Sequence, residues 1–151
     1  MTEREAIEAI LLRWQDEWEA LHPSPVMPTD PLDLDHVPWT TGNEAFASDA
    51  LGVLGAWARI HVIHTSADQT TQGSAPSRKF ERRGQIYVQL FAPIDAGRAL
   101  LAELADDVRT AIEGVRAGDL RTYAGRTEEL PDDGAWAMTV IAIPFAYTDT
   151  R

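Results

Sequence analysis

A strand that runs directly into an amphipathic helix is the pattern that most constrains the fold of this chain. Across residues 85–92 the side chains alternate with the period of two of a β-strand, and Pro93 ends the alternation. Asp95 can accept hydrogen bonds from the free amide groups at the start of a following helix. The apolar residues beyond it recur at spacings of three and four: Leu100, Leu101, Leu104, Val108, Ala111, Ile112 and Val115. The pattern predicts a helix that packs through one side and stops at Gly114 or Gly118.

Length and composition bound the class of protein. The 151 residues, 44% of them hydrophobic, predict one globular domain over residues 1–151. The absence of cysteine excludes disulfides and thiolate chemistry, and it fits assembly in a reducing cytoplasm. No apolar run approaches the roughly 20 residues of a membrane span, so we expect no membrane association. The net charge of −11 repels phosphate, so we expect no DNA binding across the whole surface.

The N-terminal segment predicts a helix over residues 3–21. Thr2 and Glu5 have the spacing of a capping box, in which each side chain satisfies a backbone amide at the helix start. Trp14 and Trp18 lie at positions i and i+4 on the apolar face. Such a pair could form a ridge for a partner, but we expect it to belong to the core.

Residues 22–52 predict a long irregular connection, because prolines such as Pro23, Pro25, Pro28 and Pro31 remove amide donors and disfavour helix. A connection of this length is either functional or lies over the core. Asp33, Asp35 and His36 could be imagined as metal ligands. Their spacing matches no defined site, so we expect neither a metal nor a cofactor.

Residues 56–65 alternate again and predict a second strand with one wet face. His61 and His64 lie on opposite faces of it, so they cannot both bind one ion without a bulge. Residues 66–77 are small and polar and predict a mobile excursion. Together with the basic residues that follow, they form an arm at residues 66–83 that has no core of its own and that we expect to become ordered against a neighbour.

The basic end of this arm is the candidate interaction site. It could meet an acidic surface of a partner or of another copy of the chain, or it could be a solvated loop. The residues that we assign to a subunit or partner interface are Arg78, Lys79, Phe80, Arg82 and Arg83.

The C-terminal part predicts two further strands, over residues 119–127 and 135–147, joined by a turn at residues 129–134. Pro144 cannot donate a ladder hydrogen bond, so it predicts an edge strand or a bulge. The element order is α-β-β-α-β-β. We therefore expect an α+β fold with a mostly antiparallel four-stranded sheet, two main helices packed on one face, and a projecting hairpin or loop arm.

Motifs of catalysis do not occur in the sequence. It has no phosphate-binding glycine loop with its lysine, no G-x-S-x-G, no H-E-x-x-H and no C-x-x-C. The four histidines never fall at a spacing that pairs them with a carboxylate in a recognised arrangement. We expect no enzyme activity, although a site assembled from distant residues stays open.

The order of elements and the stretch from Arg82 to Ile112 resemble the tail terminator, or tail completion, proteins of long-tailed bacteriophages, including prophage and gene-transfer-agent members. In that family a strand carrying R-x-G, an alternating apolar run and F-x-P leads into a helix of the pattern G-x-x-x-A-x-x-L-A-D-x-(V/L)-R. An upstream segment of proline, aromatic residue and asparagine also matches. The positions that carry the resemblance are Pro38, Trp39, Asn43, Glu44, Arg82, Arg83, Gly84, Phe91, Pro93, Gly97, Leu101, Leu104, Ala105, Asp106, Val108 and Arg109.

The resemblance implies a structural role in the virion and no cofactor. Such proteins form a hexameric ring that caps the tail tube, ends its polymerisation and offers a docking surface to the head-tail connector. The implied partners are other copies of the chain, the tail tube protein and the connector, and DNA passes through the channel without specific binding. The implied location is the head-proximal end of the tail, after assembly in the cytoplasm of the bacterial host.

Two other functions stay open. Another subunit of the same particle, such as a connector or a tail tube protein, would share the α/β build and the ring. A small-molecule-binding domain or enzyme would instead have a deep pocket lined by buried polar groups and would be monomeric or dimeric.

Overall fold

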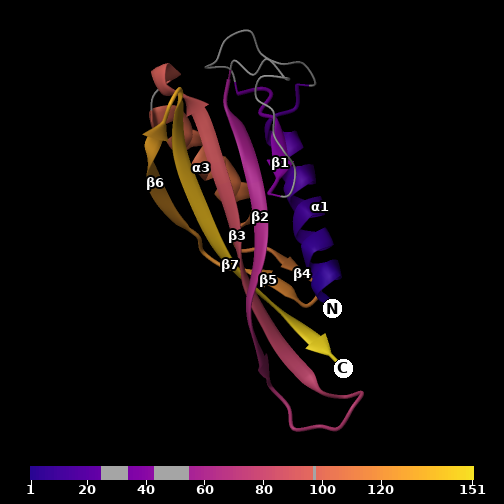
Figure 1. Ribbon diagram of the computed structural model, residues 1–151. Helices are drawn as coiled ribbons and strands as arrows, with labels where there is room; N and C mark the ends of the chain where they lie inside the picture. Colours follow the sequence, from indigo (N-terminus) through magenta and orange to yellow (C-terminus); the bar gives the residue numbers. More distant parts are fainter. Residues whose placement is uncertain (25–33, 43–54, 97) are drawn as a thin grey trace.

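The computed structural model describes residues 1–24, 34–42, 55–96 and 98–151 (Figure 1). The predictions made for Asp33, Asn43, Glu44 and Gly97, and for most of the connection at 22–52, lie outside the described residues. The elements are α1 (Glu3–Leu21), β1 (Trp39–Thr41), β2 (Trp57–Gln69), β3 (Lys79–Pro93), the 3-10 helix η1 (Ile94–Ala96), α3 (Arg98–Ile112), β4 (Arg116–Ala117), β5 (Leu120–Thr122), β6 (Arg126–Asp133) and β7 (Trp136–Thr150).

The fold is α+β, as the sequence predicts, but the sheet is larger than expected. It is curled, mixed and seven-stranded in the described part of the chain, with the order β1-β2-β3-β7-β5-β4, and β6 pairs with β7. The long strands β2, β3 and β7 are antiparallel neighbours, whereas β1 runs parallel to β2. The expectation of four strands was wrong for two reasons: β1 and β4 carry too few residues to show a period, and the strand predicted over residues 119–127 is divided into β5 and β6.

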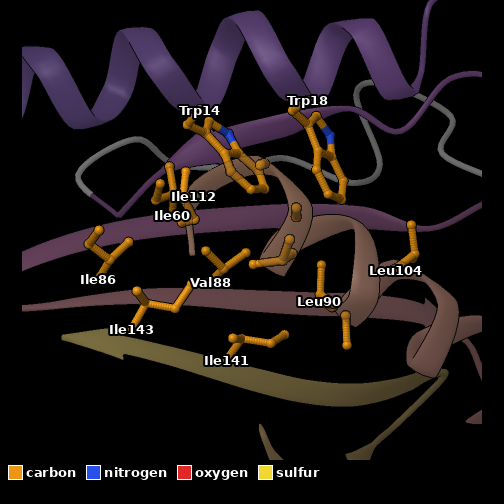
Figure 2. Packing of buried hydrophobic residues seen from close by; sticks show 14 of the residues in the cluster. Trp14, Trp18, Ile60, Ile86, Val88, Leu90, Leu104, Ile112, Ile141 and Ile143 are labelled. Atoms are coloured by element: carbon orange, nitrogen blue, oxygen red, sulfur yellow. The ribbon is translucent and has the colours of Figure 1, made fainter. Parts of the chain in front are cut away.

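One face of the sheet packs against both helices. In β3, Ile86, Val88 and Leu90 are fully buried and join one apolar cluster with the buried residues of α1 and α3. Figure 2 shows Trp14 and Trp18 pointing from α1 into this cluster. Their rings stack at 4.4 Å, which confirms that the pair belongs to the core.

The ends of the helices follow local sequence signals. Thr2 and Glu5 form the predicted capping box at the start of α1. The predicted cap of the second helix was wrong, because Asp95 lies within η1 and α3 begins only at Arg98. Gly114 stops this helix as predicted, with a φ of 69° that favours glycine.

Pro144 lies in a central strand, so the prediction of an edge strand was wrong. β7 is flanked by β3 on one side and by β5 and β6 on the other. The amide of Tyr123 donates to the carbonyl of Pro144 at 2.9 Å, so the proline nitrogen faces that second side too. The proline is opposite the gap between Thr122 in β5 and Arg126 in β6, where β7 changes partner.

The turn predicted at residues 129–134 is shorter than expected. Asp133 still pairs with Trp136, so only Gly134 and Ala135 connect β6 to β7. Gly134 has a φ of 58°, as tight hairpins require. The proline and aspartate before it lie in β6, at a register shift.

The arm is a paired extension of the sheet: of the excursion predicted over residues 66–77, residues 66–69 are part of β2, and only the tip lies outside the strands. β2 continues to Gln69, which pairs with Phe80 in β3. Lys79 in turn pairs with Thr150, so the end of β7 forms a third strand of the arm. Figure 1 shows this extension projecting beyond α1, with residues 70–78 as its tip. The expectation that the arm needs a neighbour to become ordered was wrong, because β7 of the same chain supplies the ladder.

Candidate interface on the open face of the sheet

The face of the sheet that turns away from both helices is the candidate functional surface, and we call it the open face. Strand alternation defines it: in β3 the even-numbered side chains enter the core, so the odd-numbered ones lie on the open face. Their partners on β7 are even-numbered, and the pairings of β5 and β6 with β7 extend the face.

Alternation divides the basic cluster that the sequence singled out. Lys79 and Arg83 lie on the open face, where Arg83 pairs with Glu81 at 2.6 Å. Phe80 and Arg82 lie on the opposite side of the sheet, where Arg82 approaches Asp149. Arg78 lies at the tip, where its Nε donates to the carbonyl of Gly73. The five residues therefore do not form one surface.

Three arginines from later in the sequence join the open face. In the strand register, Arg121 lies opposite Ala146 of β7 and opposite Arg116 of β4, and Arg126 lies opposite Ala142 of β7. Arg116, Arg121 and Arg126 therefore share the face of the even-numbered residues of β7. All three are exposed, and within the described part of the chain none makes an ion pair. No sequence pattern points to these arginines, because they are separated along the chain and only strand pairing brings them together.

The open face carries an excess of positive charge in an otherwise acidic protein. Among the described residues, six of the 13 basic side chains of the chain but only four of its 24 acidic ones lie on this face. The basic ones are Arg59, Lys79, Arg83, Arg116, Arg121 and Arg126, and the acidic ones are Asp68, Glu81, Asp119 and Glu128.

A shallow groove of about 330 Å³ crosses the open face where the arm meets the body. Thr65, Arg83, Pro144 and Ala146 line it, together with Tyr123, which is 46% exposed. A tyrosine with an apolar ring and a polar end is typical of protein interfaces. The groove is broad, and it lacks the enclosed polar lining of a small-molecule site.

The far end of the open face holds an aromatic cluster. The rings of Trp57 and Phe91 stack at 3.9 Å, and Trp136 meets Trp57 edge-on. The guanidinium of Arg59 lies over both stacked rings, at 5.4 Å from the first and 6.0 Å from the second. This contact fixes one cation of the face in place.

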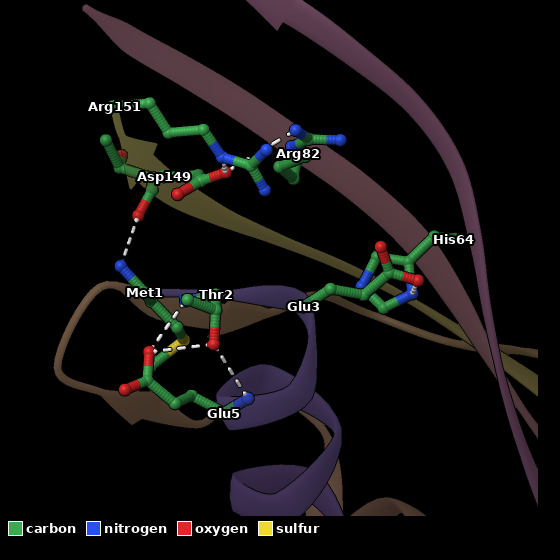
Figure 3. A network of polar contacts seen from close by, with 9 residues as sticks. Met1, Thr2, Glu3, Glu5, His64, Arg82, Asp149 and Arg151 are labelled. Carbon is green, nitrogen blue, oxygen red and sulfur yellow. Dashed lines mark hydrogen bonds and ion pairs between the residues drawn. The ribbon is translucent and has the colours of Figure 1, made fainter. Parts of the chain in front are cut away.

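On the helix side, a polar network ties the arm to the start of α1 (Figure 3). The carboxylate of Asp149, only 3% exposed, lies 3.4 Å from Arg82 and 2.7 Å from Arg151. His64 lies 3.4 Å from Glu3 of α1. Burial lowers the pKa of His64, the charge of Arg82 lowers it further, and Glu3 opposes both.

A second histidine holds the end of α1. His22 is buried, its Nδ1 lies 2.5 Å from the carbonyl oxygen of Leu34, and its Nε2 lies 3.3 Å from Asp107 of α3. Burial raises the pKa of Asp107, and His22 opposes the rise. The side chain of His36 bonds to the carbonyl of Ser24 in the same region. These contacts link the two helices and the following segment, which is a structural role.

The described residues contain no group of three or more His, Asp or Glu side chains that could hold a metal ion. His61 and His64 lie on opposite faces of β2, as predicted. Within the described ranges, no helix is both long and apolar enough to span a bilayer.

Comparison with known proteins informs the fold alone. No family model matches the chain, and no curated protein matches it. A solved protein structure with 15% sequence identity is similar over 97% of this chain and 96% of the other, with a TM-score of 0.64. The name of that protein states neither an activity nor a partner.

Proposed function

We propose that this chain is a structural subunit of a phage-type particle, a tail terminator that forms a ring at the end of the tail tube. The ring, a hexamer by resemblance to that family, ends tube polymerisation and offers a surface to the head-tail connector. The chain acts through its outer surfaces and carries out no reaction.

The projecting arm together with the open face is the observation that carries this proposal. Both helices lie on one side of the sheet, and no described helix covers the other side, over the body or over the arm. Lys79, Arg83, Arg121 and Arg126 lie exposed there, with Tyr123 beside them. A subunit that works only within a ring leaves such a surface uncovered as a monomer.

The charge balance supports the proposal as well. A net charge of −11 keeps phosphate from adhering to a channel through which DNA must slide. The cations of the open face are compatible with this only if another protein surface covers them, as it does inside a ring.

Inactivation of the gene in the particle-producing element tests the proposal. Because a tube without its terminator continues to polymerise, negative-stain images should show tails longer than those of the intact particle and not joined to heads. Purified protein added before tube assembly should restore the normal length.

Two results would count against a terminator. Tails of normal length that lack heads would point to a connector. Particles with normal tails and heads would show that the chain has no role in tail assembly.

A further inference from the structure

We infer that the open face of one copy docks on the helix layer of the next copy, through opposite charge. The inference rests on the proposed ring and names the two surfaces that form each contact within it. The occupant of the open face is therefore a second copy of the same chain, presenting α1 and α3.

The helix layer, formed by α1 and α3, carries an excess of negative charge, opposite to the positive excess of the open face. The segments of α1 and α3 contain nine acidic side chains against four arginines. Three of the arginines pair within their own helix or just after it: Arg4 with Glu8, Arg13 with Glu17, and Arg109 with Asp106 and Glu113, whereas Arg98 pairs with Asp132 of β6. Glu3 and Asp107 lie next to histidines, and Asp16, Glu19 and Glu103 make no ion pair within the described part of the chain.

Asp16 and Glu19 of α1 belong to this acidic surface. Both are exposed, and they make no ion pair within the described part of the chain. Leu12 lies one helical turn before Asp16 and is 60% exposed. The exposed side of α1 thus offers an apolar side chain next to carboxylates, which suits a groove that presents Tyr123 next to arginines.

The arrangement of the two surfaces determines the kind of assembly. The acidic helices and the cationic open face lie on opposite sides of one sheet. Two copies that join these surfaces leave one surface of each kind free, so the contact repeats from copy to copy. A repeating heterologous contact closes into a ring or extends as a filament, and it does not stop at a two-fold dimer.

A nucleic acid is the less suitable occupant. Glu81, Asp119 and Glu128 lie among the cations of the open face and would repel phosphate. A partner with both carboxylates and arginines, such as α1, can pair with both kinds of charge. Charge complementarity therefore selects another copy of the chain.

Charge reversal on one surface at a time, and then on both, tests the inference. The open-face variant carries Arg121→Glu and Arg126→Glu, and the helix-layer variant carries Asp16→Lys and Glu19→Lys. A fourth protein combines all four changes and has the net charge of the wild type. The control carries Arg78→Glu, Gln72→Glu and Ser74→Glu at the exposed tip of the arm, which changes the net charge by as much as the open-face variant and leaves both docking surfaces intact.

Sedimentation velocity at low salt, where surface charges are weakly screened, gives the readout, and circular dichroism melting checks that each variant is folded. The wild type and the control should self-associate with rising concentration. Each single-surface variant should lose at least tenfold in apparent affinity. A one-to-one mixture of the two variants, or the combined protein, should recover it, because reversed surfaces then meet each other.

Three results would overturn the inference: no self-association of the wild type, variants that associate as the wild type does, or no recovery in the mixture. The inference would also be overturned if the wild type bound a DNA duplex at physiological salt and the open-face variant did not, because the open face would then be a nucleic-acid-binding surface.

The test separates this inference from the proposed function. If the mixture recovers self-association but the particle with the inactivated gene has normal tails, the contact between copies is supported and the terminator function is refuted. Overlong tails together with variants that associate normally would keep the terminator and refute the contact.

Discussion

At the scale of single residues, Gly84 shows how the arm and the body fit together. The ring of Phe145 lies against its backbone, and a Cβ at this position would lie 2.3 Å from the carbonyl oxygen of Ile63 and 2.4 Å from that ring. The glycine of the R-x-G pattern therefore has a packing reason, because only a residue without a side chain admits the ring.

Replacement of Gly84 by alanine should destabilise the protein strongly. Since the nearest obstacle is backbone and cannot move aside, we expect a loss of about 2–3 kcal/mol in the free energy of unfolding, measured by urea denaturation. Gly73→Ala is the matched control, because its nearest neighbour would lie 3.4 Å away. Equal stability of the two variants would contradict this account of Gly84.

At the scale of elements, the arm depends on a buried carboxylate. Asp149 holds Arg82 of β3 and Arg151 at the end of β7, so it joins two strands of the arm. Asp149→Asn removes the charge without changing the shape, and we expect a loss of roughly 1–2 kcal/mol.

The loss should be local. Hydrogen exchange should speed up at the amides of residues 79–83 and stay unchanged in α1 and α3. Asp68→Asn, an exposed change in the same arm, should leave all of these rates as they are. Faster exchange throughout the molecule would show that Asp149 supports the whole core instead.

The junction of the arm and α1 should make stability depend on pH. Burial holds the pKa of His64 below its usual 6.5, so the unfolded chain binds the proton more readily than the folded one. The contribution of neutral His64 is fully present above pH 6.5 and is lost as the pH falls toward the lower, folded pKa.

His64→Gln should therefore flatten the fall in melting temperature between about pH 7 and pH 5, relative to the wild type. Asp107 acts in the opposite direction at lower pH, because burial raises its pKa and its protonation favours the folded state. Identical pH profiles for the variant and the wild type would exclude His64 as the cause.

Local signals in the sequence predicted α1, the amphipathic helix α3 and the alternation of β2 and β3, because period, caps and glycine stops act within a few residues. The ends of the strands were not predictable in this way. Residues 79–83 are mostly charged and read as a loop, yet they form a strand because β2 and β7 pair with both of their sides. Pairing partners lie far away in the chain, so no local pattern contains them.

The residues of the candidate site were also only partly predictable from local sequence patterns. The basic cluster was visible as a run of residues, but its division between two faces followed from strand alternation once residues 79–83 proved to be β-strand. Arg116, Arg121 and Arg126 could be grouped only after β5 and β6 were known to flank β7.

At the scale of the whole molecule, the protein has two sides of opposite character, an acidic helix layer and a cationic open face. A contact between the helix layer of one copy and the open face of the next would be electrostatic, so self-association should weaken as the salt concentration rises. We expect the apparent affinity of self-association to fall at least tenfold between about 0.05 and 0.5 M salt. Sedimentation velocity measures this directly. Association that strengthens with salt would indicate apolar docking instead.

The most direct measurement of the central claim is cryo-electron microscopy of the tail end of the intact particle, with this subunit located by fitting. The account predicts a ring at the head-proximal end of the tube, in which the open face of each copy lies against α1 of the next. A map in which the open face stays exposed to solvent or lines the channel, or in which the subunit is absent from the tail end, would contradict it.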